Sequence, residues 1–455
     1  MKVSREAIYH NVRSIPTLRF EDQKMTSFAG LVVFEALLRR LGWKRRLNSC
    51  CGHLRQACTY SATVIVELLI VHLLLGYRRL QDIGLYRDDP MVLRLLGLEK
   101  LPDVSIVSRA LRSMDAKVVE GLRAQARALV LDRLVEAGLR RVTLDFDGSV
   151  QSTRRRAEAT AVGFNRTRKG GRSYYPLLCT VSQTGQVFDV LFRPGNVHDS
   201  NGALQFVIEC IERVRERMPA VQVEVRMDGA FFSEEMAEYL SAFEVEYSIS
   251  VPFERLAALK GLIEQRSYWK RLGNAQEGFE KQWKPACWRS RRRFVMVRRR
   301  VRERQRTPLQ LDLFEPISES YEYKVILTNK RARARSVVAF HEGRGSQEGI
   351  IGELKSQAAM DYIPVRTWIG NQVYLLCGIF AHNLGRELQM QTGEPVKKRS
   401  QKRSALWRFE QLGTLRKKWI QRAGRLTRPE GRLTLTLGTN ETVQNRLLQL
   451  LGASA

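Results

Sequence analysis

The sequence has no apolar segment long enough to act as a secretion signal or a membrane span. Its opening residues, MKVSREAIYHNVRS, contain no apolar core of signal-peptide length. The most apolar stretch, VIVELLIVHLLLG at residues 64–76, is too short to cross a bilayer, and Glu67 and His72 interrupt it. We therefore expect residues 64–76 to form a buried helix.

Cysteine is also sparse, with seven residues scattered along the chain. Cys50, Cys51, His53 and Cys58 lie close together in sequence and leave a zinc site as an alternative. The paired C-x2-C spacing of common zinc sites is missing, however. The pattern favours free thiols in a reducing compartment.

Acidic residues are few relative to basic ones: 47 Asp and Glu stand against 76 Lys and Arg, giving a formal net charge of +29. Such a surplus repels itself in a compact chain, which indicates a polyanionic partner. Nucleic acid is the first candidate and an anionic membrane surface the second. With 44% hydrophobic residues and 455 residues in all, the chain is globular and long enough for two or three domains.

Helical periodicity dominates residues 1–138, which we interpret as a helical N-terminal DNA-binding region. Within it, LPDVSIVSRALRSM at 101–114 predicts a loop and then a helix that begins near Ser105 and exposes Arg109 and Arg112. That helix could be the second one of a helix-turn-helix, or an ordinary packed helix.

The pattern changes from helix to strand near residue 139, which predicts an α/β fold with a mixed sheet. The expected order is three strands, a helix, a strand, a helix and a strand, over residues 141–147, 175–183, 186–195, 200–217, 221–228, 232–243 and 245–252. We assign 139–252 to the first part of a core and 337–392 to its second, helical part. Between them, 253–336 is a basic β-rich insertion, and 393–455 is a basic helical tail.

Two aspartates end strands of this core. Asp147 is followed by Gly-Ser, and Asp228 by Gly-Ala-Phe. A parallel pairing of the two strands would bring both carboxylates to one edge of the sheet. Asp145 points to the same face as Asp147 and remains an alternative to it, whereas a lone Asp at a strand end is often only a turn residue.

A third acid lies in HEGRGSQEGIIGELK, residues 341–355. On a helix, Glu348 and Lys355 share a face, and Arg344 precedes Glu348 by one turn. Glu353 is a weaker rival, because it would point about 140° away. Three converging carboxylates would repel one another without a cation, and oxygen ligands suit Mg²⁺, with Mn²⁺ as an alternative. Two such ions could hold both oxygens of a phosphodiester displacement, whereas a solvated helix face with ordinary ion pairs is the plainer interpretation.

Basic and aromatic residues interleave between 165 and 175, as suits a DNA backbone and unstacked bases, although a plain basic hairpin has the same composition. The stretch RPGNVHDS at 193–200 predicts a loop contact to DNA, with His198 as an alternative general base. Residues 289–306 hold ten arginines and one glutamate. The residues expected to contact DNA are Arg166, Lys169, Arg172, Tyr174, Arg193, Asn196, Arg291, Arg292, Arg293, Arg344 and Lys355.

Taken together, these stretches resemble a bacterial DDE transposase of the group with the signature Tyr-x2-Arg-x3-Glu-x6-Lys. Arg344, Glu348 and Lys355 match that spacing, while His341 stands where the signature has Tyr. More narrowly, the chain is similar to the insertion sequence 1380 family through LDFDGS, GFNRTRKGGRSYYPLL, RPGNVHDS, RMDGAFF, RGSQEGIIGELK and AHNLGREL, which follow in order over residues 140–390.

The resemblance implies a ribonuclease-H-like core with a β-rich insertion before the glutamate. It also implies an enzyme that cuts DNA at the inverted repeats ending its own element and joins those ends to target DNA, with Asp147, Asp228 and Glu348 as metal-binding catalytic residues. A homodimer would hold two ends together. The implied location is the bacterial cytoplasm, in association with the nucleoid. A nuclease that only hydrolyses DNA and a non-catalytic DNA-binding descendant are the rival functions.

Overall fold

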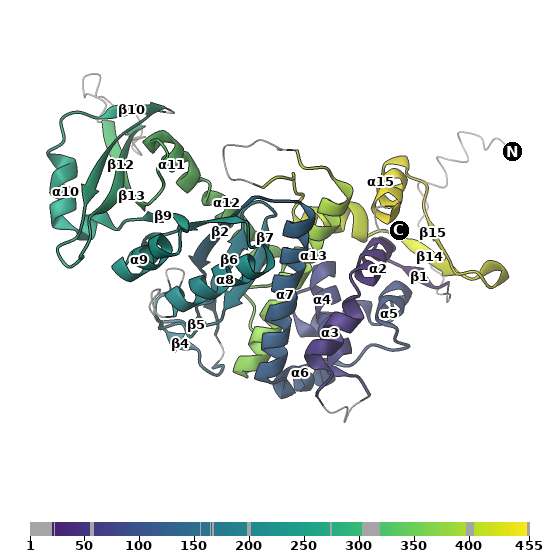
Figure 1. Cartoon of the computed structure of the whole chain (residues 1–455). Coiled ribbons are helices and arrows are strands. Elements are labelled where there is room, and N and C mark those ends of the chain that lie inside the picture. The colour runs from purple at the N-terminus through teal and green to yellow at the C-terminus, as the bar shows by residue number, and fades with distance from the viewer. Residues whose placement is uncertain are drawn as a thin grey trace, which may run out of the picture.

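The computed structural model describes residue 21 and residues 23–54, 59–154, 156–163, 165, 168–197, 202–273, 275–302, 319–396 and 405–452. Its centre is a mixed sheet in which five strands follow the predicted order (Figure 1). They lie side by side as β7 (Gln186–Leu191), β6 (Leu177–Val181), β2 (Arg141–Gly148), β8 (Gln222–Met227) and β9 (Glu246–Ser250). The first three strands in the sequence pair antiparallel, and β8 and β9 then pair parallel to β2.

Successive side chains along a strand point to opposite faces of the sheet, and apolar side chains bury both faces. In β6, Leu177 and Cys179 belong to one hydrophobic cluster and Leu178 to another. The first cluster includes α8 (Ala203–Arg217) and α9 (Glu234–Ala242), and the second includes α13 (Trp368–Thr392). Between β2 and β6 the chain forms a small separate sheet of β3 (Gln151–Ser152), β5 (Arg172–Tyr174) and β4 (Ala161–Val162).

The N-terminal region is helical, as predicted. Its helices are α2 (Leu31–Arg40), α3 (Trp43–Cys51), α4 (Ala62–Leu75), α5 (Pro90–Leu96), α6 (Val104–Ser113) and α7 (Ala116–Glu136). The apolar run is the buried helix α4, which Ser61 caps and Gly76 ends at φ 97°. Within the part of the chain that the structure describes, no helix has the length and apolar character of a membrane span.

These helices do not build a core of their own. Their buried side chains form one cluster with α13 and with residues of the C-terminal tail. The tail contains α14 (Leu412–Leu415) and α15 (Glu441–Gly452), but also β14 (Gly424–Thr427) and β15 (Thr434–Leu437), which form a sheet with β1 (Met25–Thr26). The prediction of a helical tail was wrong for residues 424–437, where β14 and β15 form a local hairpin and β1, from the other end of the chain, pairs with β14.

The insertion is β-rich, as predicted. After α10 (Ala257–Glu264) come β10 (Lys270–Gly273), β11 (Gln276–Trp283), β12 (Arg292–Arg302) and β13 (Glu319–Thr328). Strand β13 pairs antiparallel with β9, so the insertion lengthens the central sheet to nine strands instead of forming a separate layer (Figure 1).

Candidate active site

Two aspartates meet at one edge of the central sheet. In the parallel pair of β2 and β8, Phe146 lies opposite Met227, so Asp147 and Asp228 are the next residues of the two strands. The predicted parallel pairing is confirmed. Asp228 also accepts a hydrogen bond of 3.0 Å from the amide of Ala230, which fixes the turn where the chain leaves the sheet.

The electrostatics of this edge are unfavourable for two ionised carboxylates. Burial, and then the negative charge of Asp228, raises the pKa of Asp147 to about 6. Arg344 opposes this rise, whereas the charge of Glu348 adds to it. The three predicted acids therefore act on one another in the folded chain.

The third acid arrives on a separate helix. Residues 334–342 form α11 (Ala334–Glu342), and after a break at Gly343 the chain resumes as α12 (Gly345–Gln357). Arg344 stands at the start of α12 and lies between two of the acids. Its Nη1 is 3.3 Å from Oδ2 of Asp147, and its Nη2 is 3.7 Å from Oε1 of Glu348.

Lys355 lies further along the same helix. Burial lowers its pKa, and the charges of Asp361 and Asp147 oppose that shift. The positive charge of Lys355 therefore acts on Asp147.

The donor chemistry of these acids fits a hard divalent ion, and Asp147 beside Asp228 gives such an ion two oxygen ligands from rigid strand ends. The third ligand is not in place. Glu348 keeps 68% of its side chain exposed and turns to Arg344. Among the described residues no three His, Cys, Asp or Glu side chains come close enough together to hold a metal ion. The predicted metal-sized cluster of three is thus incomplete in this arrangement, because Arg344 lies where the acids converge.

The rival acids have other partners. Asp145 is fully buried and receives two hydrogen bonds from Arg226, of 2.5 and 2.7 Å, so its oxygens are already occupied. Glu353 is buried on the far side of α12, where His382 and Arg386, against the effect of burial, hold its pKa down to about 2. Neither residue is available to a metal ion at the sheet edge, and Asp145 as an alternative ligand was wrong.

His341, which replaces the signature tyrosine, lies on α11 and is buried. Its Nε2 is 2.8 Å from the hydroxyl of Ser250, and its Nδ1 is 3.0 Å from that of Ser248. Burial lowers its pKa to about 3, so the ring is neutral at ordinary pH. The contact it makes is internal to the fold.

Two of the residues expected to bind DNA are buried, which corrects their assignment. Tyr174 is 0% exposed; its hydroxyl donates to the carbonyl of Glu158 and accepts from Asn371. Arg193 is 4% exposed, donates to the carbonyl of Tyr175 and lies over the ring of that tyrosine. The interleaved pattern that suggested stacking on bases here partly reflects internal packing.

Lys169, Arg172 and Asn196 are exposed, as DNA contacts require. Arg172 donates to the hydroxyl and carbonyl oxygens of Thr160, which fixes its position. Arg166 and the alternative base His198 lie outside the described residues. Arg109 and Arg112 are exposed on α6, which begins at Val104.

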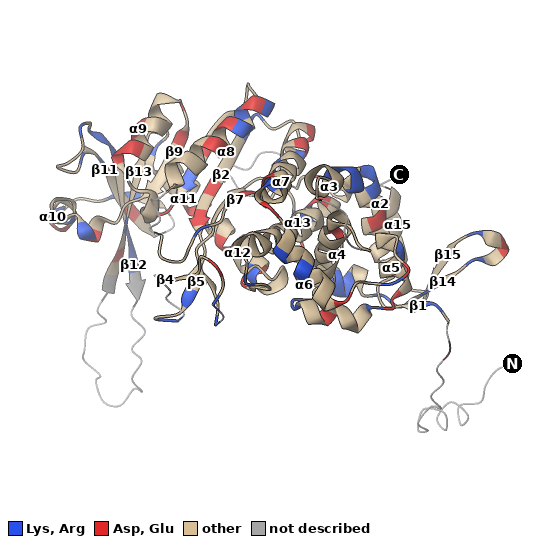
Figure 2. Ribbon diagram, turned by 90° about the horizontal axis from the view of Figure 1, so that it is seen from below, with Lys and Arg blue, Asp and Glu red and all other residues tan. Residues whose placement is uncertain are grey.

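Most arginines on the described strands of the insertion bond neighbouring side chains or main-chain carbonyls, within the insertion or on α9. Arg293 donates to Glu280 and to main-chain carbonyls, and Arg292 donates to the hydroxyl of Ser241. Arg291 is exposed. The side chains of Arg292 and Arg293 are 14% and 17% exposed, and their assignment as DNA contacts stays a prediction. Figure 2 shows that basic residues spread over both ends of the molecule.

The alternative zinc site near residue 50 is not supported within the described residues. Cys50 and Cys51 are buried free thiols, and His53 lies 2.8 Å from Asp115 instead. Cys58 lies outside the described residues.

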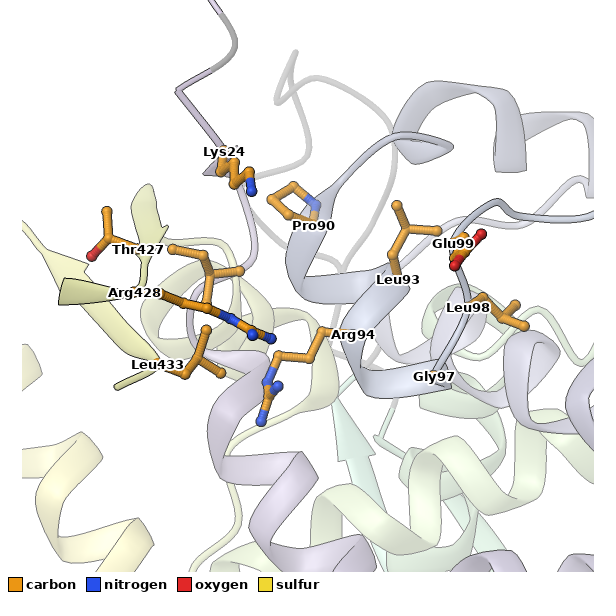
Figure 3. A pocket seen from close by; sticks show the side chains of 11 residues that line it. Lys24, Pro90, Leu93, Arg94, Gly97, Leu98, Glu99, Thr427, Arg428 and Leu433 are labelled. Atoms are coloured by element: carbon orange, nitrogen blue, oxygen red, sulfur yellow. The ribbon is translucent and has the colours of Figure 1, made fainter. Parts of the chain in front are cut away.

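A cavity of about 490 Å³ lies well apart in sequence from the aspartates, between α5 and the hairpin of β14 and β15 (Figure 3). Its walls include Pro90, Leu93, Leu98, Leu426 and Leu433, and three cations and one acid line it: Lys24, Arg94, Arg428 and Glu99. In Figure 3 the guanidinium groups of Arg94 and Arg428 point toward one another. The sequence alone did not indicate this surface, because its cations come from both ends of the chain.

Paired strand-end aspartates, a basic chain and an acid-bearing helix beside them are typical of DNA-processing enzymes with an acidic catalytic site. The chain belongs to the family Transposase DDE domain group 1, whose model matches residues 11–453. It is a transposase, an enzyme that acts on DNA, and enzymes of this family generally use divalent metal ions.

No curated protein matches the chain. Among solved structures it is remotely similar to the piggyBac transposase synaptic complex with hairpin DNA, with 11% identity, a TM-score of 0.42, and coverage of 86% of this chain and 80% of that one. It is also similar to the Mos1 transposase paired-end complex with left transposon end (14% identity, TM-score 0.18, 43% and 60% covered). A third match is the Mos1 mariner paired-end complex with Mn (15% identity, TM-score 0.17, 43% and 60% covered).

Proposed function

We propose that the chain is an insertion-sequence transposase, of the insertion sequence 1380 family, that cuts its element ends and joins them to target DNA at the edge formed by Asp147 and Asp228. One observation carries this proposal: two carboxylates end adjacent parallel strands, and the helix bearing Glu348 is tied to them through Arg344. The strand order β7-β6-β2-β8-β9 supports a ribonuclease-H-like core for this reaction.

Asp147, Asp228 and Glu348 would hold two Mg²⁺ ions, with Mn²⁺ as a substitute. When bound, the ions would activate the attacking oxygen and stabilise the leaving one. Glu348 completes the site by turning its exposed side chain away from Arg344 toward the aspartates. Arg344 is then released to donate to a DNA phosphate, for which a planar guanidinium is well suited.

The order of reactions in this proposal is the one that the resemblance to DDE transposases implies. Water first attacks the phosphorus of a phosphodiester at an element end and displaces the 3′-oxygen, which gives a 3′-hydroxyl and a 5′-phosphate. That hydroxyl then attacks a phosphate of target DNA, so one P–O bond forms as another breaks and no covalent protein intermediate is needed. Holding two ends together for this step requires two copies of the chain, and we propose a homodimer on DNA.

In this proposal the DNA contacts come from the exposed residues Lys169, Arg172, Asn196 and Arg291 and from the half-buried Arg344 and Lys355 of α12. The cavity lined by Lys24, Arg94 and Arg428 adds a second anchoring surface for phosphates, because three cations from separate elements line it with a single acid. Loss of each phosphate contact should lower the salt dependence of binding by about 0.9 units of slope.

The test uses a duplex carrying the DNA that flanks the gene, with matched inverted repeats as the end sequence. The wild-type chain should cut this duplex and transfer it to a target plasmid in the presence of Mg²⁺ or Mn²⁺. Asp147→Ala should bind the duplex but neither cut nor transfer it. If the wild-type chain cuts the duplex without transferring it, the protein is a nuclease and the proposal is wrong. If Asp147→Ala still cuts, Asp147 is not a catalytic residue.

The signature residues can be tested on a pre-cut end. Arg344→Lys should transfer strands poorly, since lysine cannot donate to a phosphate or to Asp147 with a planar fork. Lys355→Arg should retain most of the wild-type rate of strand transfer, because Lys355 acts as a simple positive charge. Full activity of Arg344→Lys would make this arginine an ordinary surface charge.

A further inference from the structure

A buried ion pair lies directly beneath the two aspartates of the candidate site. Asp145 and Arg226 face each other across β2 and β8, two residues before Asp147 and Asp228 respectively. Arg226 is 0% exposed, and its Nε and Nη2 donate to the two oxygens of Asp145 at 2.5 and 2.7 Å. The pair thus joins the same two strands that carry the aspartates.

The same guanidinium reaches the helix that precedes α12. Its Nη1 donates to the carbonyl of Phe340 at 3.0 Å, near the end of α11, and its Nη2 donates to the hydroxyl of Ser182 at 2.8 Å. The guanidinium also lies 5.4 Å from the ring centre of Phe340. A cation at the C-terminal end of a helix is favourable, because the last carbonyls carry partial negative charge.

The break between α11 and α12 is shaped around this side chain. A Cβ atom at Gly343 would lie 2.1 Å from Nη1 of Arg226, so no larger residue fits while the arginine stays in place. The backbone of Gly343 has φ −58°, which any residue adopts, so space and not conformation requires glycine here. Gly343 directly precedes Arg344, the residue that contacts Asp147.

A second bond fixes the start of α12 to the same strand. Gln347 is fully buried, and its Nε2 donates to the main-chain carbonyl of Asp145 at 2.8 Å. Gln347 is the neighbour of Glu348. The first turn of α12 is therefore held to β2 through Gln347, and the break before it is held to β8 through Arg226.

We infer that Asp145, Arg226 and Gln347 are positioning residues that set the helix of the third carboxylate against the strand ends of the first two. This inference rests on the proposed function of Asp147, Asp228 and Glu348. A pair that only stabilised the fold would need no contact with the α11–α12 break, whereas these bonds converge on the residues flanking Arg344 and Glu348. Conversely, a shift of the break by a fraction of a residue would move Glu348 away from the other two ligands.

The test compares Arg226→Lys and Gln347→Leu with matched controls away from the site. Arg133→Lys is the control for the first, since Arg133 forms a similarly buried pair with Glu387 between α7 and α13. Gln186→Leu is the control for the second, since Gln186 is equally buried and its amide also donates to a main-chain carbonyl, that of Asn383. Thermal unfolding of all four variants gives their losses of stability.

Two readouts then separate positioning from stability, both taken well below the unfolding temperatures. Hydrogen exchange of the α12 first-turn amides, without metal, should quicken in Arg226→Lys and Gln347→Leu and stay unchanged in both controls. The dissociation constant for Mn²⁺ alone should rise about 10- to 100-fold in the same two variants, the range for residues that orient metal ligands. Wild-type exchange and wild-type Mn²⁺ affinity in a folded Arg226→Lys or Gln347→Leu would overturn the inference.

If Arg226→Lys fails to fold, Gln347→Leu decides alone, because it removes a single hydrogen bond. The proposed function fails separately: a wild-type chain that neither binds Mn²⁺ nor cuts DNA would refute that function. The exchange measurement would still report whether the buried pair and Gln347 fix α12.

Discussion

The β insertion and the strand ends that carry Asp147 and Asp228 belong to one nine-stranded sheet. In the insertion opposite charges face each other across neighbouring strands, whereas at the strand ends like charges lie side by side. In the insertion, Glu277 lies directly across from Arg298 and Glu322 across from Arg299, and each pair forms an ion pair. At the edge, two carboxylates end adjacent strands, and burial and their mutual repulsion raise the pKa of Asp147.

The difference shows which charges the fold itself uses. Opposite charges across neighbouring strands stabilise a sheet, so the arginines of the insertion serve its structure first. Like charges at strand ends destabilise it, so the edge is retained for some purpose other than stability. Arginine content alone therefore marked the insertion more strongly as a DNA surface than its geometry supports.

The largest effect should come from removing one acid of the edge. If Asp228 holds a metal ion as proposed, Asp228→Asn should lower the rate of DNA cutting by about 10³-fold or more, because the charge of that ligand is lost. Its matched control in the insertion, Glu277→Gln, should cut at a rate close to wild type. Single-turnover cleavage of the flanking-DNA duplex measures both, and equal losses in the two variants would erase the distinction between the regions.

Glu67 is a second carboxyl whose pKa is raised by burial, and it sharpens the comparison. Burial raises the pKa of Glu67 in α4 to about 7, and Lys44 opposes this only in part. The folded chain therefore binds a proton between about pH 4.5 and 7 that the unfolded chain does not, and stability falls as pH rises through that window. Glu67→Gln should remove the fall and be up to about 3 kcal/mol more stable than wild type at pH 8.

Urea unfolding at pH 5 and pH 8 checks this prediction. The advantage of Glu67→Gln should be larger at pH 8 than at pH 5. An advantage that is the same at both pH values would mean that Glu67 does not titrate in this window.

His341→Tyr tests whether position 341 of the signature stretch serves the packing of the fold. The larger ring has to enter a buried place where His341 now bonds Ser248 and Ser250, so we expect a loss of about 1–3 kcal/mol from overpacking. Thermal unfolding measures this loss, and a variant as stable as wild type would show that the fold accepts tyrosine at this buried position.

Much of this architecture could be predicted from the sequence. Strand alternation in LDFD and in VQVEVRMD placed Asp147 and Asp228 at strand ends, because period-2 patterns are local. The spacing of Arg344, Glu348 and Lys355 placed them on one helix for the same reason. The pairing of β1 with β14 was not visible, since it joins residues about 400 apart.

The sequence also did not show which polar and charged residues pack inside the fold. Tyr174 and Arg193 have the composition of a DNA contact, and only the packing around them shows that they are buried. The pair of Asp145 and Arg226 left a usable signal, because each stands two residues before an aspartate of the site. The ion pair can be inferred from this spacing once the register places Asp145 of β2 opposite Arg226 of β8.

The smallest effects should separate two arginines of the insertion. Arg298 pairs with Glu277 and lies 4.6 Å from the ring centres of both Trp269 and Tyr321. Arg298→Ala should therefore cost about 1 kcal/mol of stability with little change in the salt slope of DNA binding. Exposed Arg291→Ala should leave stability unchanged and lower that slope by about 0.9. The reverse pattern would indicate that Arg298, and not Arg291, contacts DNA.

The central claim is that Asp147, Asp228 and Glu348 together hold divalent ions, and calorimetric titration of the chain with Mn²⁺ tests it most directly. The wild-type chain should bind Mn²⁺, and Asp147→Asn, Asp228→Asn and Glu348→Gln should each weaken that binding by at least about 10-fold, whereas Glu277→Gln should not. Unchanged Mn²⁺ affinity in Glu348→Gln, with Arg344 still bridging toward Asp147, would contradict the assignment of the third ligand.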